Sequence, residues 1–189
     1  MPEEYLAVDG LEFNYKGLFD FKDLLRYIKR IFNQHGYRVI EKEKEAKIKS
    51  AGKDFYIEFL AEKEKTKFEK LTIILKLNIT NMINTTVIVD SKTRKLNQAD
   101  ITAIFDAWLI TDFKGRWTAP WYFFLKTLFR HGFTKIGERF EDELINDTNT
   151  ICENLKAHLN LHRFVEVKPK KKLTKEQQEQ GDKQATSKA

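Results

Sequence analysis

The sequence has a single cysteine among 189 residues. One thiol excludes an internal disulfide framework and a cysteine-based zinc cluster. No uncharged apolar run approaches the ~20 residues that a helix needs to cross a bilayer, so we expect no transmembrane segment. The chain begins Met-Pro-Glu-Glu and no apolar signal core follows. We therefore expect no secretory signal and a cytoplasmic protein.

Glycine is also scarce, with 8 residues, and none of them forms the phosphate-binding patterns GxGxxG or GxxxxGK. The nucleophile pattern GxSxG is missing as well. His158 and His162 are four residues apart, but no third ligand or HExxH pattern accompanies them. Cys152 falls on an apolar helix face, where a thiol is usually inert. We predict a protein that is not an enzyme and holds no metal or cofactor.

Charge of one sign does not dominate the body of the chain. The 34 basic and 28 acidic residues leave a net charge of +6, and residues 165–189 carry half of it, with seven lysines against four acids. From residue 168 onward this segment has one leucine and no aromatic residue. Such a composition cannot bury enough apolar area to offset the entropy lost on folding. We predict one domain over residues 1–164 and a disordered basic tail over residues 165–189.

The body begins with a strand and a capped helix. Residues 4–16 alternate loosely between apolar and polar positions, which predicts a strand that bends at Gly10 and ends at Gly17. Asp20 can cap the free N–H groups of a following helix, and Gly36 can end it. The apolar residues of that helix recur at the spacing of one buried face: Phe21, Leu24, Leu25, Ile28, Ile31 and Phe32.

The opposite face of this helix carries four basic residues within about a third of its circumference. They are Lys22, Arg26, Lys29 and Arg30. With the tail lysines, among them Lys170, Lys171 and Lys172, they suit phosphate contacts to nucleic acid or the ribosome. We favour a solvated face instead, because residues 1–164 carry only +3 and mixed surface charge is usual for a domain.

The middle of the chain has the period of two that is typical of strands. Residues 37–48 alternate glutamate with lysine over much of their length, which suits an edge strand, because charge discourages pairing with another chain. Residues 55–62 and 71–79 alternate apolar and polar positions, and Asn81 and Asn84 indicate a turn. Short polar connections between these strands predict an antiparallel meander.

The last part of this region is ambiguous. A further turn is expected over residues 91–98, and residues 97–112 fit either a helix or a strand. We favour the strand, although periodicity alone does not decide for a short apolar run. A strand places Ala103 and Ala107 on the covered face of the sheet, where their small side chains leave room for a close-packed helix or a small cavity.

Residues 138–162 carry an apolar stripe at helical spacing. At ~1.5 Å per residue, this helix is long enough to lie across a whole sheet. The expected class is α+β, with an antiparallel meander of about five or six strands packed against an N-terminal helix and a long C-terminal helix. This order of elements resembles the helix-grip arrangement of START-like lipid- and ligand-binding domains. The resemblance implies an apolar cavity between a curved sheet and the C-terminal helix.

Two short segments resemble small uncharacterised archaeal proteins. One reads Gly-Leu-Glu-Phe-Asn-Tyr-Lys-Gly-Leu-Phe-Asp-Phe at residues 10–21, and the other reads Asp-Phe-Lys-Gly-Arg-Trp at residues 112–117. The resemblance spans most of the body in the same order and favours a strand before Asp112. It implies no activity and no functional residues.

Aromatic residues make up 13% of the chain and concentrate between residues 117 and 133. Pro120 and Gly132 are placed to begin and end a helix there. We favour packing of this block into the core. The alternatives are a partner-binding surface, an interfacial membrane helix, or closure of a ligand cavity. The candidate contact residues are Trp117, Trp121, Tyr122, Phe123 and Phe124.

The leading functional hypothesis is non-catalytic binding of an apolar small molecule or lipid between the sheet and the helices. It rests on the element order and on the small Ala103 and Ala107 among large aromatic residues. One alternative is association with nucleic acid or the ribosome through the basic residues of the first helix and the tail. Another is docking to a protein partner or a membrane surface through residues 117–133.

Overall fold

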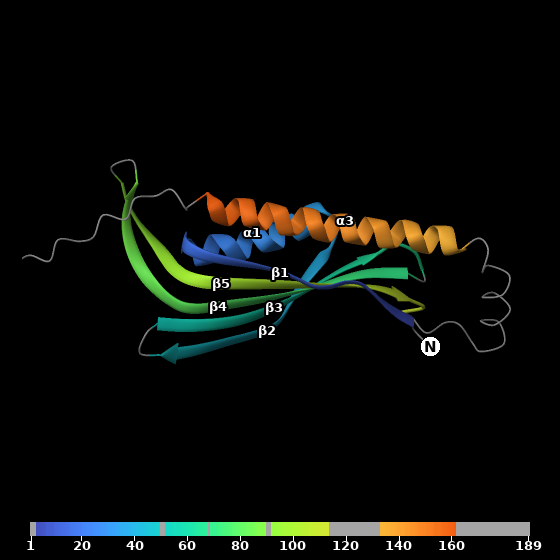
Figure 1. The fold of residues 1–189 in the computed structure, drawn as a ribbon, viewed down its shortest axis with the longest axis horizontal. Coiled ribbons are helices and arrows are strands. Elements are labelled where there is room, and N and C mark those ends of the chain that lie inside the picture. The colour runs from blue at the N-terminus through green and yellow to red at the C-terminus, as the bar shows by residue number, and fades with distance from the viewer. Residues whose placement is uncertain (1–2, 50–51, 68, 90–91, 114–132, 162–189) are drawn as a thin grey trace, which may run out of the picture.

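A computed structural model describes residues 3–49, 52–67, 69–89, 92–113 and 133–161 of the chain (Figure 1). The described elements run in the order strand, helix, four strands and helix, and their five strands fall within the predicted five or six. They are β1 (Glu3–Phe19), α1 (Phe21–Gln34), β2 (Arg38–Lys49), β3 (Gly52–Glu64), β4 (Glu69–Val89), β5 (Lys92–Thr111) and α3 (Phe133–Asn160).

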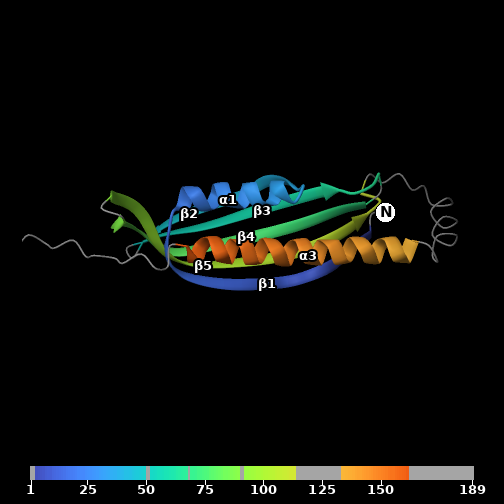
Figure 2. The same cartoon turned by 90° about the horizontal axis from the view of Figure 1, so that it is seen from above.

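The five strands form one antiparallel sheet in the order β1-β5-β4-β3-β2. Strands β2 to β5 are consecutive neighbours, as in a meander, and β1 returns to pair with β5 at the edge. Both described helices lie on one face of the sheet (Figure 1). Seen from above, α1 lies towards β2 and α3 lies over β5 and β1 (Figure 2). The predicted α+β class is confirmed.

The first strand bends at Gly10, as predicted. Gly10 has a φ of +61°, and the pairing of β1 with β5 shifts register between Val8 and Leu11. Gly17 does not end the strand, which corrects our prediction, because pairing with β5 continues to Phe19. A Cβ at Gly17 would lie 2.7 Å from the hydroxyl oxygen of Tyr15. This glycine therefore makes room for an aromatic side chain within the strand.

Helix α1 begins and ends as predicted. The Asp20 side chain accepts hydrogen bonds from the backbone N–H groups of Lys22 and Asp23, and Gly36 follows the helix with a φ of +81°. Four of the six predicted core residues of this helix are buried, and the other two pack against the core. The buried four are Leu24, Ile28, Ile31 and Phe32.

The predicted turn between Asn81 and Asn84 is wrong. Strand β4 runs 21 residues through this point, with Asn81 in the left-handed region at a φ of 55° and a register shift between Thr80 and Ile83. The bulge bends the strand without ending it, because pairing with β5 resumes and continues to Val89. Asparagine suits both a turn and a bulge, so only the pairing distinguishes them.

The ambiguous segment is a strand, and it begins earlier than expected. Residues 92–98 also belong to β5, so the turn predicted over residues 91–98 was placed too late in the chain, because Val89 of β4 already pairs with Lys92 of β5. Beyond the bulge, β4 and β5 curve towards the side of the sheet that carries the helices (Figure 1). The described sheet therefore has five strands, the lower of the two numbers that we predicted.

The core lies between the sheet and the two helices. Helix α3 has 28 residues and begins at Phe133, a few residues before the predicted start. Leu144, Ile151, Leu155 and Leu159 of its predicted stripe are buried, and Phe140 packs against the core. The buried hydroxyl of Thr148 donates to the carbonyl oxygen of Leu144 at 2.7 Å. The helix predicted from Pro120 and the tail of residues 165–189 lie outside the described residues.

Candidate functional site

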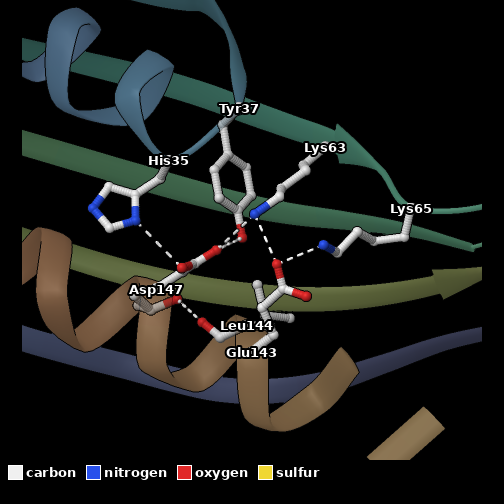
Figure 3. Close-up of polar contacts among 8 residues, drawn as sticks. His35, Tyr37, Lys63, Lys65, Glu143, Leu144 and Asp147 are labelled. Atoms are coloured by element: carbon white, nitrogen blue, oxygen red, sulfur yellow. Dashed lines mark hydrogen bonds and ion pairs between the residues drawn. The ribbon is translucent and has the colours of Figure 1, made fainter. Parts of the chain in front are cut away.

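A polar network lies where one flank of α3 meets β3 and the end of α1 (Figure 3). Its centre is Asp147 of α3. The carboxylate of Asp147 accepts a hydrogen bond from the Tyr37 hydroxyl at 3.0 Å and from the Lys63 ammonium at 3.1 Å. The Nδ1 atom of His35 lies 3.3 Å from the other oxygen. Three segments that are far apart in the sequence thus meet at one carboxylate.

Glu143 extends the network one turn earlier along α3. Its carboxylate lies 2.8 Å from the ammonium nitrogen of Lys63 and 2.6 Å from that of Lys65 (Figure 3). Burial acts to raise the pKa of Glu143, but the hydrogen bonds from the two lysines outweigh it and hold that pKa below its usual value. The carboxylate is therefore stabilised in its charged form.

The network holds Tyr37 and Lys63 in unreactive protonation states. Burial, followed by the charge of Asp147, raises the pKa of Tyr37 far above its usual value, so the phenol keeps its proton. Burial acts to lower the pKa of Lys63, but hydrogen bonds to Glu143 and Asp147 raise it overall, so this amine stays cationic. A phenol and an ammonium held in this way cannot serve as general bases or nucleophiles near neutral pH. The network is a clamp between α3, β3 and α1.

A second polar contact joins α1 to the other end of α3. The Nε2 atom of His158 lies 3.1 Å from the carboxylate of Asp23, and its ring stacks on Tyr27 with centroids 3.9 Å apart and an interplanar angle of 5°. The Tyr27 hydroxyl donates to the backbone carbonyl of Asn154 at 3.2 Å. His158 therefore has a structural role. His162 lies outside the described residues.

The opposite flank of α3 opens into a cleft of about 300 Å³ between this helix and β1. Four of its lining residues are consecutive on β1, and the other two are one turn apart near the end of α3. The lining residues are Phe13, Asn14, Tyr15, Lys16, Lys156 and Asn160. Phe13 and Tyr15 face the helix side of the sheet, whereas the side chains of Asn14 and Lys16 point to the opposite face, next to Thr102 and Asp100. The helix side of the cleft thus combines two aromatic rings with the ammonium group of Lys156 and the amide of Asn160, and no carboxylate is among its described lining residues.

Both lysines of the cleft have a single carboxylate partner that lies outside the lining. Lys16 is 3.2 Å from Asp100, and Lys156 is 2.8 Å from Glu153. The ammonium of Lys156 also lies 5.7 Å from the centroid of the Phe13 ring. Exposed ion pairs of this kind contribute little to stability, so either lysine can exchange its partner for a bound anion. The cleft can therefore accept negative charge.

The two predicted alanines lie in the core and not in this cleft. Ala103 pairs with Phe13 of β1 and Leu77 of β4, and Ala107 pairs with Val8 and Ile73. Both alanines are fully buried in the cluster that includes the apolar stripe of α3. Their small side chains allow α3 to pack closely on β5, which is one of the two outcomes that the sequence left open.

The basic stripe of α1 is exposed, but three of its four residues interact with other side chains of the protein. Lys29 lies 3.1 Å from Glu41, and Arg26 lies 3.6 Å from Asp23. The guanidinium of Arg30 lies 5.1 Å from the centroid of the Tyr27 ring. The tail residues Lys170, Lys171 and Lys172 lie outside the described residues, as does the aromatic block with Trp117, Trp121, Tyr122, Phe123 and Phe124.

Two other residues with potentially reactive side chains are held by burial or by polar contacts. Cys152 is buried, and burial raises the pKa of its thiol. Asp106 lies 2.7 Å from the ammonium of Lys76 and accepts a hydrogen bond from the Gly10 backbone N–H at 3.0 Å. Within the described part of the chain, no group of three or more His, Cys, Asp or Glu residues is placed to hold a metal ion.

Comparisons with known proteins do not add a functional assignment. No family model matches the chain, and no curated protein or solved structure matches it. The resemblances to START-like domains and to small archaeal proteins therefore remain predictions. None of the described helices is long and apolar enough to cross a membrane.

Sequence reasoning missed both polar regions on the flanks of α3. The clamp joins positions 35, 37, 63, 65, 143 and 147, and no spacing rule connects them. The cleft had a partial signal, because Lys156 and Asn160 share a helix face and Asn14 and Lys16 share a strand face. Only the docking of α3 beside β1 forms the cleft, and it leaves Asn14 and Lys16 with their side chains on the far face of the strand.

Proposed function

We propose that this protein is a non-catalytic binding protein and that its ligand site is the cleft between β1 and α3. The ligand is an organic anion with an apolar portion. The observation that carries this proposal is the lining of the cleft, in which the ammonium group of Lys156 lies 5.7 Å from the centroid of the Phe13 ring and no carboxylate is among the described lining residues. Ammonium groups attract an anion, and aromatic rings provide apolar contact area.

The size of the cleft supports a small ligand. A volume of about 300 Å³ is at the lower end of the range of roughly 300–1,000 Å³ that is usual for ligand sites. Its position between the sheet and the C-terminal helix agrees with the region proposed from the sequence. The polar lining changes the expected ligand, because a purely apolar molecule would gain nothing from the ammonium group of Lys156 and the amide of Asn160.

The choice of binding over catalysis rests on the titratable groups around α3. Tyr37 and Lys63 are held in their protonated forms, and the thiol of Cys152 is buried with a raised pKa. Catalysis by a general base or a nucleophile needs a group whose pKa is adjusted towards the working pH and that can reach a substrate. The cleft offers charge and shape instead.

The proposal can be tested by NMR titration with 2-naphthoate, an aromatic carboxylate. We expect saturable shifts of the backbone amides of residues 13–16 and 156–160, and much weaker shifts with the neutral 2-naphthalenemethanol. The variant Asn160→Trp fills the cleft and should abolish the shifts, whereas Asn149→Trp, at an exposed position on the same helix, should retain them. Absence of shifts at the cleft, or equal binding of the alcohol, would overturn the proposal.

A charge-matched pair of variants provides a second control. Lys156→Gln removes a charge from the cleft, and Lys22→Gln removes the same charge from the exposed face of α1. We expect only the first variant to weaken binding, since long-range attraction changes equally in both. Equal losses in the two variants would show that net charge and not the cleft determines binding.

A further inference from the structure

The two edges of the sheet differ in how well they are protected against pairing with another chain. At one edge, β2 carries a run of alternating glutamate and lysine and a register shift between Glu41 and Glu43. Charges and bulges are the usual means by which an edge strand avoids an additional partner. The β2 edge is therefore protected.

The other edge is formed by β1 and lacks this protection beyond its bend. From Leu11 to Phe19 the strand pairs with β5 without a register shift, and only Glu12 and Lys16 carry charge in this stretch. Among the described strands, β1 pairs with β5 alone. An edge strand directs alternate backbone N–H and C=O groups away from its neighbour, so a regular stretch is a template for a further strand.

The cleft lies along this same stretch of β1, with α3 as its second wall. Figure 2 shows α3 running beside β1. An edge strand beside a helix is one arrangement by which domains bind extended peptides. The backbone of the peptide pairs with the strand, and its alternate side chains enter the groove. Here the groove presents the ammonium group of Lys156 and the amide of Asn160, whereas the side chains of Asn14 and Lys16 point to the other face of the sheet. Its charge complements an acidic side chain.

We propose that the ligand of this protein is an extended peptide segment that pairs with β1 along residues 11–16 and places a carboxylate beside Lys156. This inference rests on the proposed function, because it uses the same cleft. It adds that main-chain hydrogen bonds provide affinity and that Lys156 selects acidic side chains.

The test uses a fluorescein-labelled octapeptide that alternates valine and glutamate, with binding to the full chain measured by fluorescence anisotropy. Two further peptides are matched controls. One has N-methyl groups at alternate amides, and the other has lysine in place of glutamate. We expect each change to weaken binding by about tenfold or more, since tenfold corresponds to the loss of one or two hydrogen bonds or of a charge pair. Both changes are made in the peptide, so the fold of the protein is not disturbed.

The outcomes separate this inference from the proposed function. Hydrogen exchange of the amides of residues 11–16 should slow when the octapeptide binds, and Lys156→Gln should weaken binding more than Lys22→Gln. If 2-naphthoate occupies the cleft and the octapeptide does not, the proposed function stands and the peptide inference is wrong. Equal binding of the N-methylated peptide also overturns the inference, because pairing with β1 requires those N–H groups. If neither probe binds, both proposals fail.

Discussion

The two flanks of α3 use the same kinds of residue in opposite ways. On the flank towards β3, the side chain of Lys63 is 18% exposed and has two carboxylates within 3.1 Å. On the flank towards β1, the side chain of Lys156 is 35% exposed and has one partner, Glu153, whose own side chain is 72% exposed. One flank is a closed set of ion pairs, and the other is an open cleft.

This difference shows how α3 can be fixed to α1 and β3 on one flank while its other flank lines an open cleft. The clamp around Asp147 and the contact between His158 and Asp23 fix the position of α3 relative to α1 and β3. A helix held in this way keeps the opposite cleft in shape without using the side chains that line it. A preorganised site loses less conformational entropy when a ligand binds.

The largest difference in stability between the two flanks is expected when the carboxylate at the centre of the clamp is removed. Asp147→Ala leaves the buried Tyr37 hydroxyl and the Lys63 ammonium without their shared partner. We expect the free energy of unfolding to fall by about 2–3 kcal/mol, measured by urea denaturation. Glu153→Ala on the open flank should change it by less than about 0.5 kcal/mol. Similar losses in the two variants would contradict the distinction between the flanks.

The packing of α3 on the sheet gives the next largest effect. Ala107→Leu adds three carbon atoms at a fully buried position and should destabilise the protein by about 1–3 kcal/mol. The exposed Ala157→Leu on α3 is the matched control and should be nearly neutral. Urea denaturation measures both. A neutral Ala107→Leu would show free space under the helix and would move the ligand site back to the predicted alanines.

Low pH should reduce the stabilisation that the ion pairs of Glu143 provide on the closed flank. The pKa of Glu143 is lower in the folded state than its usual value of 4.5, so the folded protein binds fewer protons than the unfolded chain as pH falls. The stabilisation by Glu143 is therefore complete above about pH 4.5 and is lost as pH falls through the folded-state pKa. Glu143→Gln should be less stable than the natural chain at pH 7, with the gap closing towards pH 3. A gap that does not depend on pH would exclude this role of the carboxylate.

The smallest effect on stability is expected in the cleft. Lys156→Gln should change the free energy of unfolding by less than about 0.5 kcal/mol, because its ion pair with Glu153 is largely exposed. The same variant should weaken binding of 2-naphthoate several-fold in the NMR titration. A large loss of stability would show that this lysine, like Lys63, serves the fold.

Local sequence rules predicted most elements of the fold. Asp20 and Gly36 mark the ends of α1, and the alternation in residues 71–79 and the apolar stripe of α3 identify buried faces. The rules failed at Gly17 and between Asn81 and Asn84, where pairing with β5 carries the strands through residues that favour turns. Strand pairing is a long-range interaction, so it overrides local preference without leaving a local signal.

The candidate site was less predictable than the fold. The sequence directed attention to Ala103 and Ala107, because their size stands out within an apolar strand. The cleft is lined instead by common polar residues such as Asn14 and Lys156, which resemble any solvated residue until α3 is docked beside β1. The clamp was missed for the same reason, since contacting members are separated by up to 112 positions in the sequence.

The sequence by itself determined the fold class, the caps of α1, the faces that are buried and the absence of the catalytic motifs named above. These properties depend on the spacing and composition of residues along the chain. The tertiary structure decided that one flank of α3 is closed and the other is open. It also decided that β1 forms a regular edge beyond its bend, whereas β2 forms an edge with alternating charge and a register shift. Those properties depend on which strands become neighbours and on where a helix docks, and contacts between distant residues set both.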